Sequence, residues 1–148
     1  MNVSRSSLLP YSVKQMYDVI ADVRSYPAFL NWCSGMAIIS ESDDELVAEL
    51  IISYGKLKFS FTTRNTMIEN QHVSMQLVKG PFSKLSGQWT IQELSHSACK
   101  VSLEMDFKFD NMLAQKLFGR AFQSIIAAQL DAFHNRAEQL YRDSTSIT

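Results

Sequence analysis

Apolar and polar residues alternate through the middle of the chain, from about residue 33 to residue 109. In the clearest stretch, residues 57–64, Leu57, Phe59 and Phe61 share one face and charged or hydroxyl side chains occupy the other. A period of two is typical of an antiparallel sheet with one buried and one solvated face. The same pattern predicts strands at residues 36–40, 46–53, 73–77, 85–91 and 101–109, separated by turns at SDDE, Tyr54-Gly55 and ENQH.

The N-terminal segment predicts one strand and two short helices. Residues 2–9 read as a strand that Pro10 ends. Ser12 followed by Gln15 forms the pattern of a capping box, and a short apolar face follows it. Ser25 and Pro27 then predict the cap and first turn of a second short helix.

A long helix is predicted to close the chain, from a cap at Asp110 or Asn111 to about Tyr141. Gly119 within it costs about 1 kcal/mol relative to alanine, and it either allows close packing on the sheet or leaves room beneath the helix. We expect residues 143–148 to form a disordered tail. The predicted apolar stripe of this helix consists of Leu117, Phe118, Phe122, Ile125, Ile126, Leu130, Phe133, Ala137 and Leu140.

This order of elements predicts an α+β fold in a single domain over residues 1–142. A twisted sheet of this size curls, and the long helix is the element able to cover its concave face. Such a grip need not fill its interior completely. The sequence therefore predicts a curved antiparallel sheet closed by one helix, with room for an apolar cavity between them.

The stretch SYPAFLNWC, residues 25–33, places an unusual density of aromatic side chains in a connector, where polar residues are common. It either plugs one end of the core or forms the entrance to the cavity, where it would meet the loop at residues 79–87. The expected entrance residues are Tyr26, Phe29, Leu30 and Trp32. The expected contacts with an apolar ligand are Phe61, Trp89, Met105, Phe107, Phe122 and Ile126, although Trp89 and Phe107 are also typical core residues.

The energy of an empty cavity limits this hypothesis. Ligand pockets start near ~300 Å³, and at ~24 cal/mol per Å³ a dry void of that size costs on the order of 7 kcal/mol. That cost is comparable with the whole stability of a domain. We therefore expect the space to be occupied, wetted or able to collapse. A prenyl tail would fill it, with about 0.8 kcal/mol for each buried methylene.

Composition narrows the classes of function. The formal net charge of the 148 residues is −1, which argues against a protein built mainly to bind nucleic acid, and no sequence-specific DNA binding is expected. The chain has one candidate basic stripe, which is either an ordinary soluble face or a contact surface for RNA or anionic lipid. The residues of this stripe are Lys56, Lys58, Arg64, Lys79 and Lys84.

Signals for catalysis, metals and export are weak. His72, His96 and His134 lack metal-ligand spacing, and no nucleophile elbow or phosphate loop occurs. Cys33 and Cys99 are expected to be buried, reduced thiols. No apolar run has the length of a membrane span or of a signal peptide, so we expect a cytoplasmic protein whose membrane contact, if any, is peripheral at the inner membrane.

Several linked segments resemble the RatA/coenzyme Q-binding family of the START-like polyketide cyclase and lipid-transport superfamily, over about residues 3–141. These segments are SRSSLLPYSVKQMYDVIADVRSYPAFLNWC, FSFTTRN, LVKGPFSKLSGQW, ACKVSLEMDFKFDN and the FGRAF helix. The resemblance implies a helix-grip (START-like) fold. One departure is Asn31, where the family commonly has proline, which leaves the backbone of the proposed entrance freer.

The resemblance also implies three functions. The leading expectation is non-enzymatic binding or chaperoning of ubiquinone or another prenylquinone or lipid, in support of respiratory electron transport, with no cofactor and no metal required. The alternative is a ribosome-association toxin that binds the large ribosomal subunit and blocks subunit joining. The third is an enzyme similar to polyketide cyclases, which the absence of a visible acid/base pair disfavours.

Overall fold

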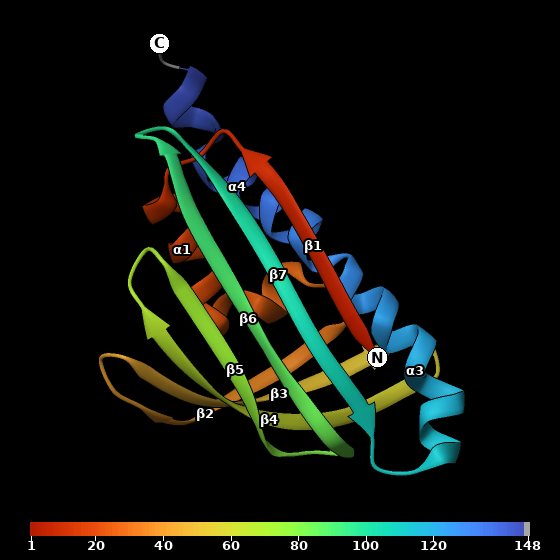
Figure 1. Ribbon diagram of the computed structural model, residues 1–148. Helices are drawn as coiled ribbons and strands as arrows, with labels where there is room; N and C mark the ends of the chain where they lie inside the picture. The colour runs from red at the N-terminus through yellow and green to blue at the C-terminus, as the bar shows by residue number, and fades with distance from the viewer. Residues whose placement is uncertain (147–148) are drawn as a thin grey trace.

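The protein folds as one curved antiparallel sheet with helices across its concave face (Figure 1). The structure, a computed structural model, describes residues 1–146. The elements in chain order are β1 (Asn2–Leu9), α1 (Val13–Ala21), a 3₁₀ turn (Val23–Ser25), α2 (Tyr26–Phe29), β2 (Cys33–Glu41), β3 (Glu45–Tyr54), β4 (Leu57–Ile68), β5 (His72–Lys79), β6 (Phe82–Ser95), β7 (Ala98–Phe109), α3 (Met112–Ala127) and α4 (Gln129–Ser146).

The strand order is β1-β7-β6-β5-β4-β3-β2, so the first strand pairs with the last and every neighbouring pair is antiparallel. This confirms the strands that the alternation predicts. One position differs: Thr62, expected on the wet face, is buried. The register between β4 and β5 shifts at Thr62 and Thr63, which interrupts the strict alternation there.

The prediction of a loop at residues 79–87 is wrong. β5 runs to Lys79 and β6 begins at Phe82, so only Gly80 and Pro81 lie between the strands. Gly80 has φ +156°, and a Cβ on it would lie 2.8 Å from the Cβ of Phe61. Pairing between β5 and β6 ends at Gln76 and Ser86, so the two strands separate before they reach Gly80, whose close approach to Phe61 favours glycine. Residues 79–87 are therefore strand ends joined by a two-residue connection, and they form no entrance loop.

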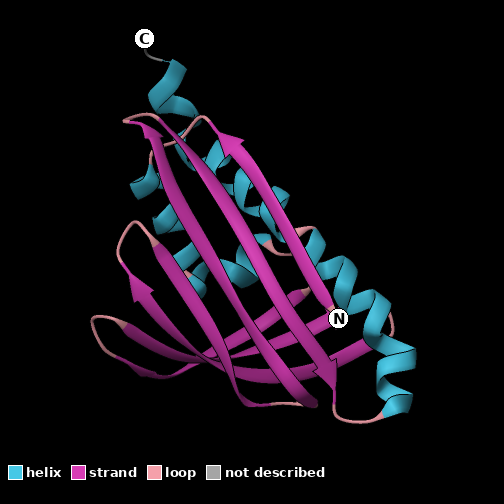
Figure 2. Ribbon diagram, in the orientation of Figure 1, coloured by secondary structure: helices cyan, strands magenta, loops and turns pink. Residues whose placement is uncertain are grey.

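The N-terminal capping box is confirmed. The Ser12 hydroxyl accepts from the Gln15 N–H at 3.1 Å, and the Ser12 N–H donates to the Gln15 side chain at 2.9 Å. α2 is a single turn with Pro27 in its first positions, as predicted, but the Ser25 hydroxyl donates to Asp22 and does not cap the helix. α1 and α2 lie with α4 on the concave side of the sheet (Figure 2).

The closing helix is bent. Asn111 caps α3 by accepting from the Ala114 N–H at 2.7 Å, and α3 and α4 meet at Ala128. The Ile125 carbonyl accepts from the Ala128 N–H at 3.3 Å and from the Gln129 side chain at 3.0 Å. A side chain that enters the backbone ladder is a known cause of a bend. Gly119 does not break α3: a Cβ there would lie 2.5 Å from Nε2 of Gln115 in the same helix and 3.4 Å from Sδ of Met1.

The end of the helix and the tail differ from expectation in part. Leu117 and Leu140, which the periodicity places in the apolar stripe, are 61% and 51% exposed. α4 continues to Ser146, beyond the predicted boundary at residue 142. The remainder of the predicted tail, residues 147–148, lies outside the described residues.

Candidate functional site

A small apolar cavity lies between the concave face of the sheet and the bent helix, with a volume of about 80 Å³. It is much smaller than the space that a prenylquinone requires. At ~24 cal/mol per Å³ an empty cavity of this size costs about 2 kcal/mol, which a folded domain tolerates. The residues that line it are Val23, Tyr26, Trp32, Ala48, Leu50, Phe61, Thr63, Asn65, Val73, Met75, Leu85, Trp89, Leu103, Met105, Phe122, Ile125, Ile126, Gln129 and Phe133.

Neutral polar side chains interrupt this apolar lining. On β4, the Thr63 hydroxyl donates to the Asn65 side-chain oxygen at 2.9 Å, and both residues are buried. From the helix, the Gln129 amide donates to the Ile125 carbonyl. The Trp32 indole N–H is buried and has no hydrogen-bond partner among the described residues. A buried, unsatisfied donor is costly, so this N–H favours a ligand that carries an acceptor.

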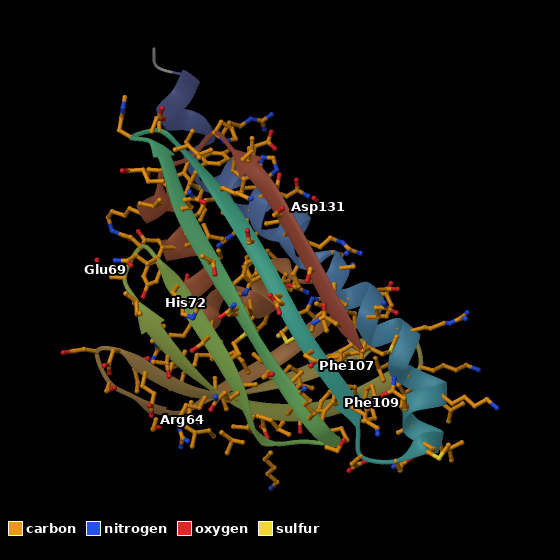
Figure 3. The ribbon with its side chains drawn as sticks, in the orientation of Figure 1. Arg64, Glu69, His72, Phe107, Phe109 and Asp131 are labelled. Carbon is orange, nitrogen blue, oxygen red and sulfur yellow. The ribbon has the colours of Figure 1, made fainter. Side chains whose placement is uncertain are left out.

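A larger groove of about 430 Å³ lies outside the cavity, along the bent helix. Its volume is within the range of about 300–1,000 Å³ that is usual for ligand pockets. The aromatic connector forms one wall, the β3–β4 turn contributes Tyr54, and the α3–α4 junction forms the other wall. Asp131 of α4, labelled in Figure 3, and Arg136 make this groove more polar than the cavity.

Three side chains separate the groove from the cavity, because Trp32, Ile125 and Gln129 line both. Ile125 and Gln129 lie on either side of the helix bend at Ala128. The partition is therefore one layer of side chains thick and rests on the irregular part of the helix.

The expected entrance residues all lie around this partition, and their role as an entrance stays a prediction. Tyr26 and Trp32 line the cavity, whereas Phe29, Leu30 and Trp32 line the groove. The ring of Tyr26 packs 5.4 Å from that of Phe133 on α4. The Tyr26 hydroxyl donates to the Ile20 carbonyl, and burial raises its pKa far above the ordinary value. The connector is thus fixed to α4 and α1 at one end.

The expected ligand contacts divide into two groups. Phe61, Trp89, Met105, Phe122 and Ile126 line the cavity. Phe107 is a core residue and does not line it: this ring is fully buried and packs 4.8 Å from that of Phe122. Figure 3 shows Phe107 and Phe109 together beside α3. Whether the lining residues contact a ligand stays a prediction.

Sequence reasoning did not assign the polar lining at Thr63, Asn65 and Gln129. A signal existed on β4, where the inward positions change from phenylalanine to Thr63 and Asn65. A polar residue at an inward position of a strand is a departure from the binary pattern and marks a candidate site. Gln129 carried no comparable signal, because the bend that turns it inward contains neither glycine nor proline.

The predicted basic stripe is not continuous. The Arg64 guanidinium pairs with Glu45 at 3.3 Å, and Figure 3 shows it on the opposite side of the view from α3. Lys84 pairs with Asp106 at 2.6 Å. Lys56, Lys58 and Lys79 are exposed near the end of the sheet at which α3 begins. That end, here called the basic end, also carries the exposed residues Lys108, Lys116 and Arg120.

The opposite end of the sheet has the opposite charge. The β2–β3, β4–β5 and β6–β7 turns carry Glu41, Asp43, Asp44, Glu45, Glu69 and Glu93. Arg24 and Arg64 on this side are paired with Glu41 and Glu45, and Lys100 is exposed there too, so this end is negative on balance. The net charge of −1 therefore hides a separation of charge along the strands, and the basic end offers an electrostatic surface for an anionic partner.

Within residues 1–146, none of the helices combines the length and apolarity needed to cross a membrane. The two cysteines, Cys33 and Cys99, are buried free thiols, and burial raises the pKa of each.

Comparison with known proteins identifies the family to which this architecture belongs. Residues 9–134 match the family described as polyketide cyclase / dehydrase and lipid transport. The chain is 41% identical over 139 residues to the ribosome association toxin RatA of Escherichia coli K12, covering 94% of this chain and 88% of that protein. It is 26% identical to the mitochondrial coenzyme Q-binding protein COQ10 homolog B of Xenopus laevis, covering 93% of this chain and 58% of that protein.

Among solved structures, the Zhui aromatase/cyclase from Streptomyces sp. R1128 superposes with a TM-score of 0.84 at 17% identity and covers 94% of each chain. At that identity the likeness shows the helix-grip fold alone. The family match and the full-length similarity to RatA cover the sheet, the connector and the bent helix together. The chain therefore belongs to the polyketide cyclase / dehydrase and lipid transport family, with the START-like fold, and within it to the group of the RatA proteins.

Proposed function

We propose that this protein associates with the large ribosomal subunit and blocks subunit joining. The observation that carries the proposal is the full-length similarity to proteins named ribosome association toxin, at 41% identity in Escherichia coli and 38% in Pseudomonas aeruginosa. The basic end supports it, because exposed lysines without carboxylate partners are suited to RNA phosphates. Lys58, Lys79 and Lys108 are exposed there, and no ion pair of theirs occurs within the described chain.

The test is a sucrose-gradient profile of cells that overproduce the protein. We expect separated subunits to accumulate and joined ribosomes to decrease. The triple variant Lys58→Glu, Lys79→Glu, Lys108→Glu should restore the normal profile, while Lys14→Glu and Lys100→Glu, away from the basic end, should not. With purified large subunits, the logarithm of the binding constant can be plotted against the logarithm of the salt concentration. Removing each lysine that touches a phosphate should lower the magnitude of that slope by about 1. An unchanged profile for the overproduced wild-type protein contradicts the proposal.

A second candidate function is the binding of ubiquinone or another lipid-like molecule in the grip. It is favoured by the unpaired Trp32 N–H at a partition between an apolar cavity and a groove. The cavity of about 80 Å³ holds only a few waters, so the ligand must displace the partition to enter. In this proposal the indole N–H donates to a carbonyl of the head group, and the tail occupies the joined space.

Organic extraction of the purified protein followed by mass spectrometry tests the second candidate directly. Recovery of a prenylquinone or lipid, with weaker binding by Trp32→Phe on titration, is the expected result. Trp32→Phe keeps a six-membered aromatic ring and removes the five-membered ring with its N–H donor. The control Phe29→Leu changes the groove and leaves the Trp32 donor in place. An empty extract together with no binding on titration overturns this candidate.

In both candidates the protein acts without catalysis. The described residues that line the cavity include no carboxylate, imidazole or amine. Their only ionisable side chain is Tyr26, whose hydroxyl donates to a backbone carbonyl and whose pKa burial raises. General acid/base catalysis needs a group that exchanges protons near the operating pH. The cavity itself therefore offers no such group to a polyketide cyclase chemistry, and the ionisable side chains Asp131 and Arg136 lie only in the adjoining groove.

A further inference from the structure

The first two turns of α3 expose apolar side chains that the fold does not use. Met112, Leu113 and Leu117 are 88%, 66% and 61% exposed. Burial of apolar side chains is favourable in proportion to the area removed from water, so their exposure leaves a driving force for association unused. Figure 1 shows this part of α3 (cyan) projecting past the end of β7, at the corner of the molecule far from the C-terminus.

These apolar residues share their helix face with cations. Leu113, Lys116, Leu117 and Arg120 follow at spacings of three and four residues, which places them side by side. α3 contains no acidic residue over its whole length from Met112 to Ala127. An apolar face with interleaved Lys and Arg and no carboxylate is typical of helices that lie in a membrane interface.

The opposite face of α3 holds the helix in place. The Gln115 side chain accepts from the Phe109 N–H at 2.9 Å, and the Phe118 ring lies 6.3 Å from that of Phe109. The Phe122 ring, one turn further, packs into the core. The exposed face is therefore already helical and fixed, so a docking event would not have to order this segment first.

The charges around α3 indicate which kind of partner surface this helix face would bind. Lys108 lies just before α3, and Lys79 and Lys84 lie at the same end of the sheet. Asp106 is engaged by Lys84 and by the N-terminal ammonium, at 2.6 and 3.9 Å. Asp110, exposed just before Met112, adds a second carboxylate, but Lys79, Lys84, Lys108, Lys116 and Arg120 outnumber the two carboxylates. This end is thus positive on balance around its apolar tip, which complements a negatively charged bilayer.

We infer that the outward face of α3, residues Met112, Leu113, Lys116, Leu117 and Arg120, inserts into the interface of an anionic lipid bilayer. The apolar side chains enter the acyl boundary and the two cations remain at the phosphates. This inference goes beyond both proposed functions and does not depend on either. RNA is the competing occupant of a basic surface, but phosphate contacts gain nothing from Leu113 or Leu117, so the apolar residues distinguish the two.

Vesicle flotation tests the inference with purified full-length protein. The vesicles are either phosphatidylcholine alone or an equal mixture of phosphatidylcholine and phosphatidylglycerol. We expect binding to the mixed vesicles only, reduced about tenfold or more both by Met112→Ser, Leu113→Ser, Leu117→Ser and by Lys116→Glu, Arg120→Glu. The matched control is Leu8→Ser, Ile39→Ser, Ile68→Ser, which removes side chains that are 68%, 62% and 53% exposed elsewhere, and should bind like the wild type.

A second measurement separates insertion from electrostatic adsorption. Leu113→Trp places a reporter in the exposed face, while the native Trp32 and Trp89 are 8% and 3% exposed and give a nearly constant background. Its fluorescence should shift to the blue on mixed vesicles. Three results would each overturn the inference. They are no binding of the wild type, an equal loss of binding in the matched control, and binding that survives the serine substitutions while the fluorescence of Leu113→Trp does not shift. The serine variant should leave the sucrose-gradient profile unchanged, so the result is independent of ribosome association.

Discussion

The two halves of the grip interior differ in how they are filled. Near the start of α3, the rings of Phe82 and Phe109 stack 4.6 Å apart, and Phe107 and Phe122 lie 4.8 Å apart at 82°. This half, here called the phenylalanine cluster, borders the cavity only through Phe61 and Phe122. Its members are Phe59, Phe61, Phe82, Phe107, Phe109 and Phe122.

Near the helix bend, the interior holds the cavity and its polar side chains. Here Thr63, Asn65, Gln129 and Trp32 surround a void of about 80 Å³. Phe61 and Phe122 belong to both halves, since they line the cavity and pack in the cluster. The difference teaches that stability and potential binding are separated in this fold: the cluster closes one end tightly, and the other end retains space at a tolerable cost.

The largest expected effect comes from opening the phenylalanine cluster. Phe107→Ala removes a fully buried ring and should lower the free energy of unfolding by about 3–5 kcal/mol. Urea denaturation with linear extrapolation measures it. If the alanine variant fails to fold, Phe107→Leu, expected to cost less than about 1.5 kcal/mol, serves instead. Ligand binding by the leucine variant should be unchanged, because Phe107 does not line the cavity; a loss of binding would contradict the separation.

The next effect concerns the bond that holds the connector. Tyr26→Phe leaves the Ile20 carbonyl without its donor and should destabilise by about 1–3 kcal/mol at neutral pH. The raised pKa of Tyr26 means that the folded state keeps this proton when tyrosine in the unfolded chain ionises, above pH ~10. Its contribution is therefore complete below that pH and lost as the pH rises.

Denaturation curves at increasing pH test the sign of this effect. The wild type should lose more stability than Tyr26→Phe between neutral and alkaline pH, so that the difference between them shrinks. Tyr11, Tyr17 and Tyr141 also have raised pKa values and remain in both proteins, so the variant retains some alkaline loss. Parallel curves would show that Tyr26 is not buried in the way described.

The hydrogen-bonded pair Thr63 and Asn65 on β4 allows a test of the half of the interior that contains the cavity. Thr63→Val alone leaves the Asn65 oxygen buried without its partner and should cost about 1–3 kcal/mol. The double variant Thr63→Val, Asn65→Leu removes both polar groups and should recover most of that loss. Ligand titration of the double variant should nonetheless show weaker binding. Full affinity in the double variant would mean that these polar groups serve only the fold.

Periodicity was sufficient for most of the fold, because most strands of this sheet have one buried and one exposed face, although β3 and β4 each bury three consecutive residues. It also identified the connector, whose aromatic side chains do line the groove and the cavity. Periodicity failed where the local sequence pattern does not determine the conformation or the exposure of a residue. The sharp connection at Gly80 and Pro81 depends on the backbone of Gly80 approaching Phe61. Leu117 satisfies the helical stripe although it lies on the outward face of α3, away from Phe109.

The position of the cavity was likewise beyond the sequence. Phe61 and Phe107 both occupy inward positions of central strands, yet only Phe61 borders the void. That distinction is set by the curvature of the sheet and by the bend at Ala128, which arises from a glutamine side chain and no breaker residue. Properties that depend on the packing of distant elements do not appear in a binary pattern.

The smallest expected effect is at Asn31, the first central residue of the turn that the Cys33 N–H closes by donating to the Leu30 carbonyl at 3.1 Å. Proline is favoured at that place in a turn, and Leu30 already has φ −92° and ψ 114°, which a following proline tolerates. Asn31→Pro should therefore raise the free energy of unfolding by about 0.4–1 kcal/mol, by restricting the unfolded chain. Because Asn31 and Trp32 line the groove together, a stiffer turn should also slow ligand association without weakening the final complex. Stopped-flow titration measures both, with Asn31→Ala as the control that removes the side chain alone. Destabilisation by proline but not by alanine would show that the backbone of this turn cannot accept it.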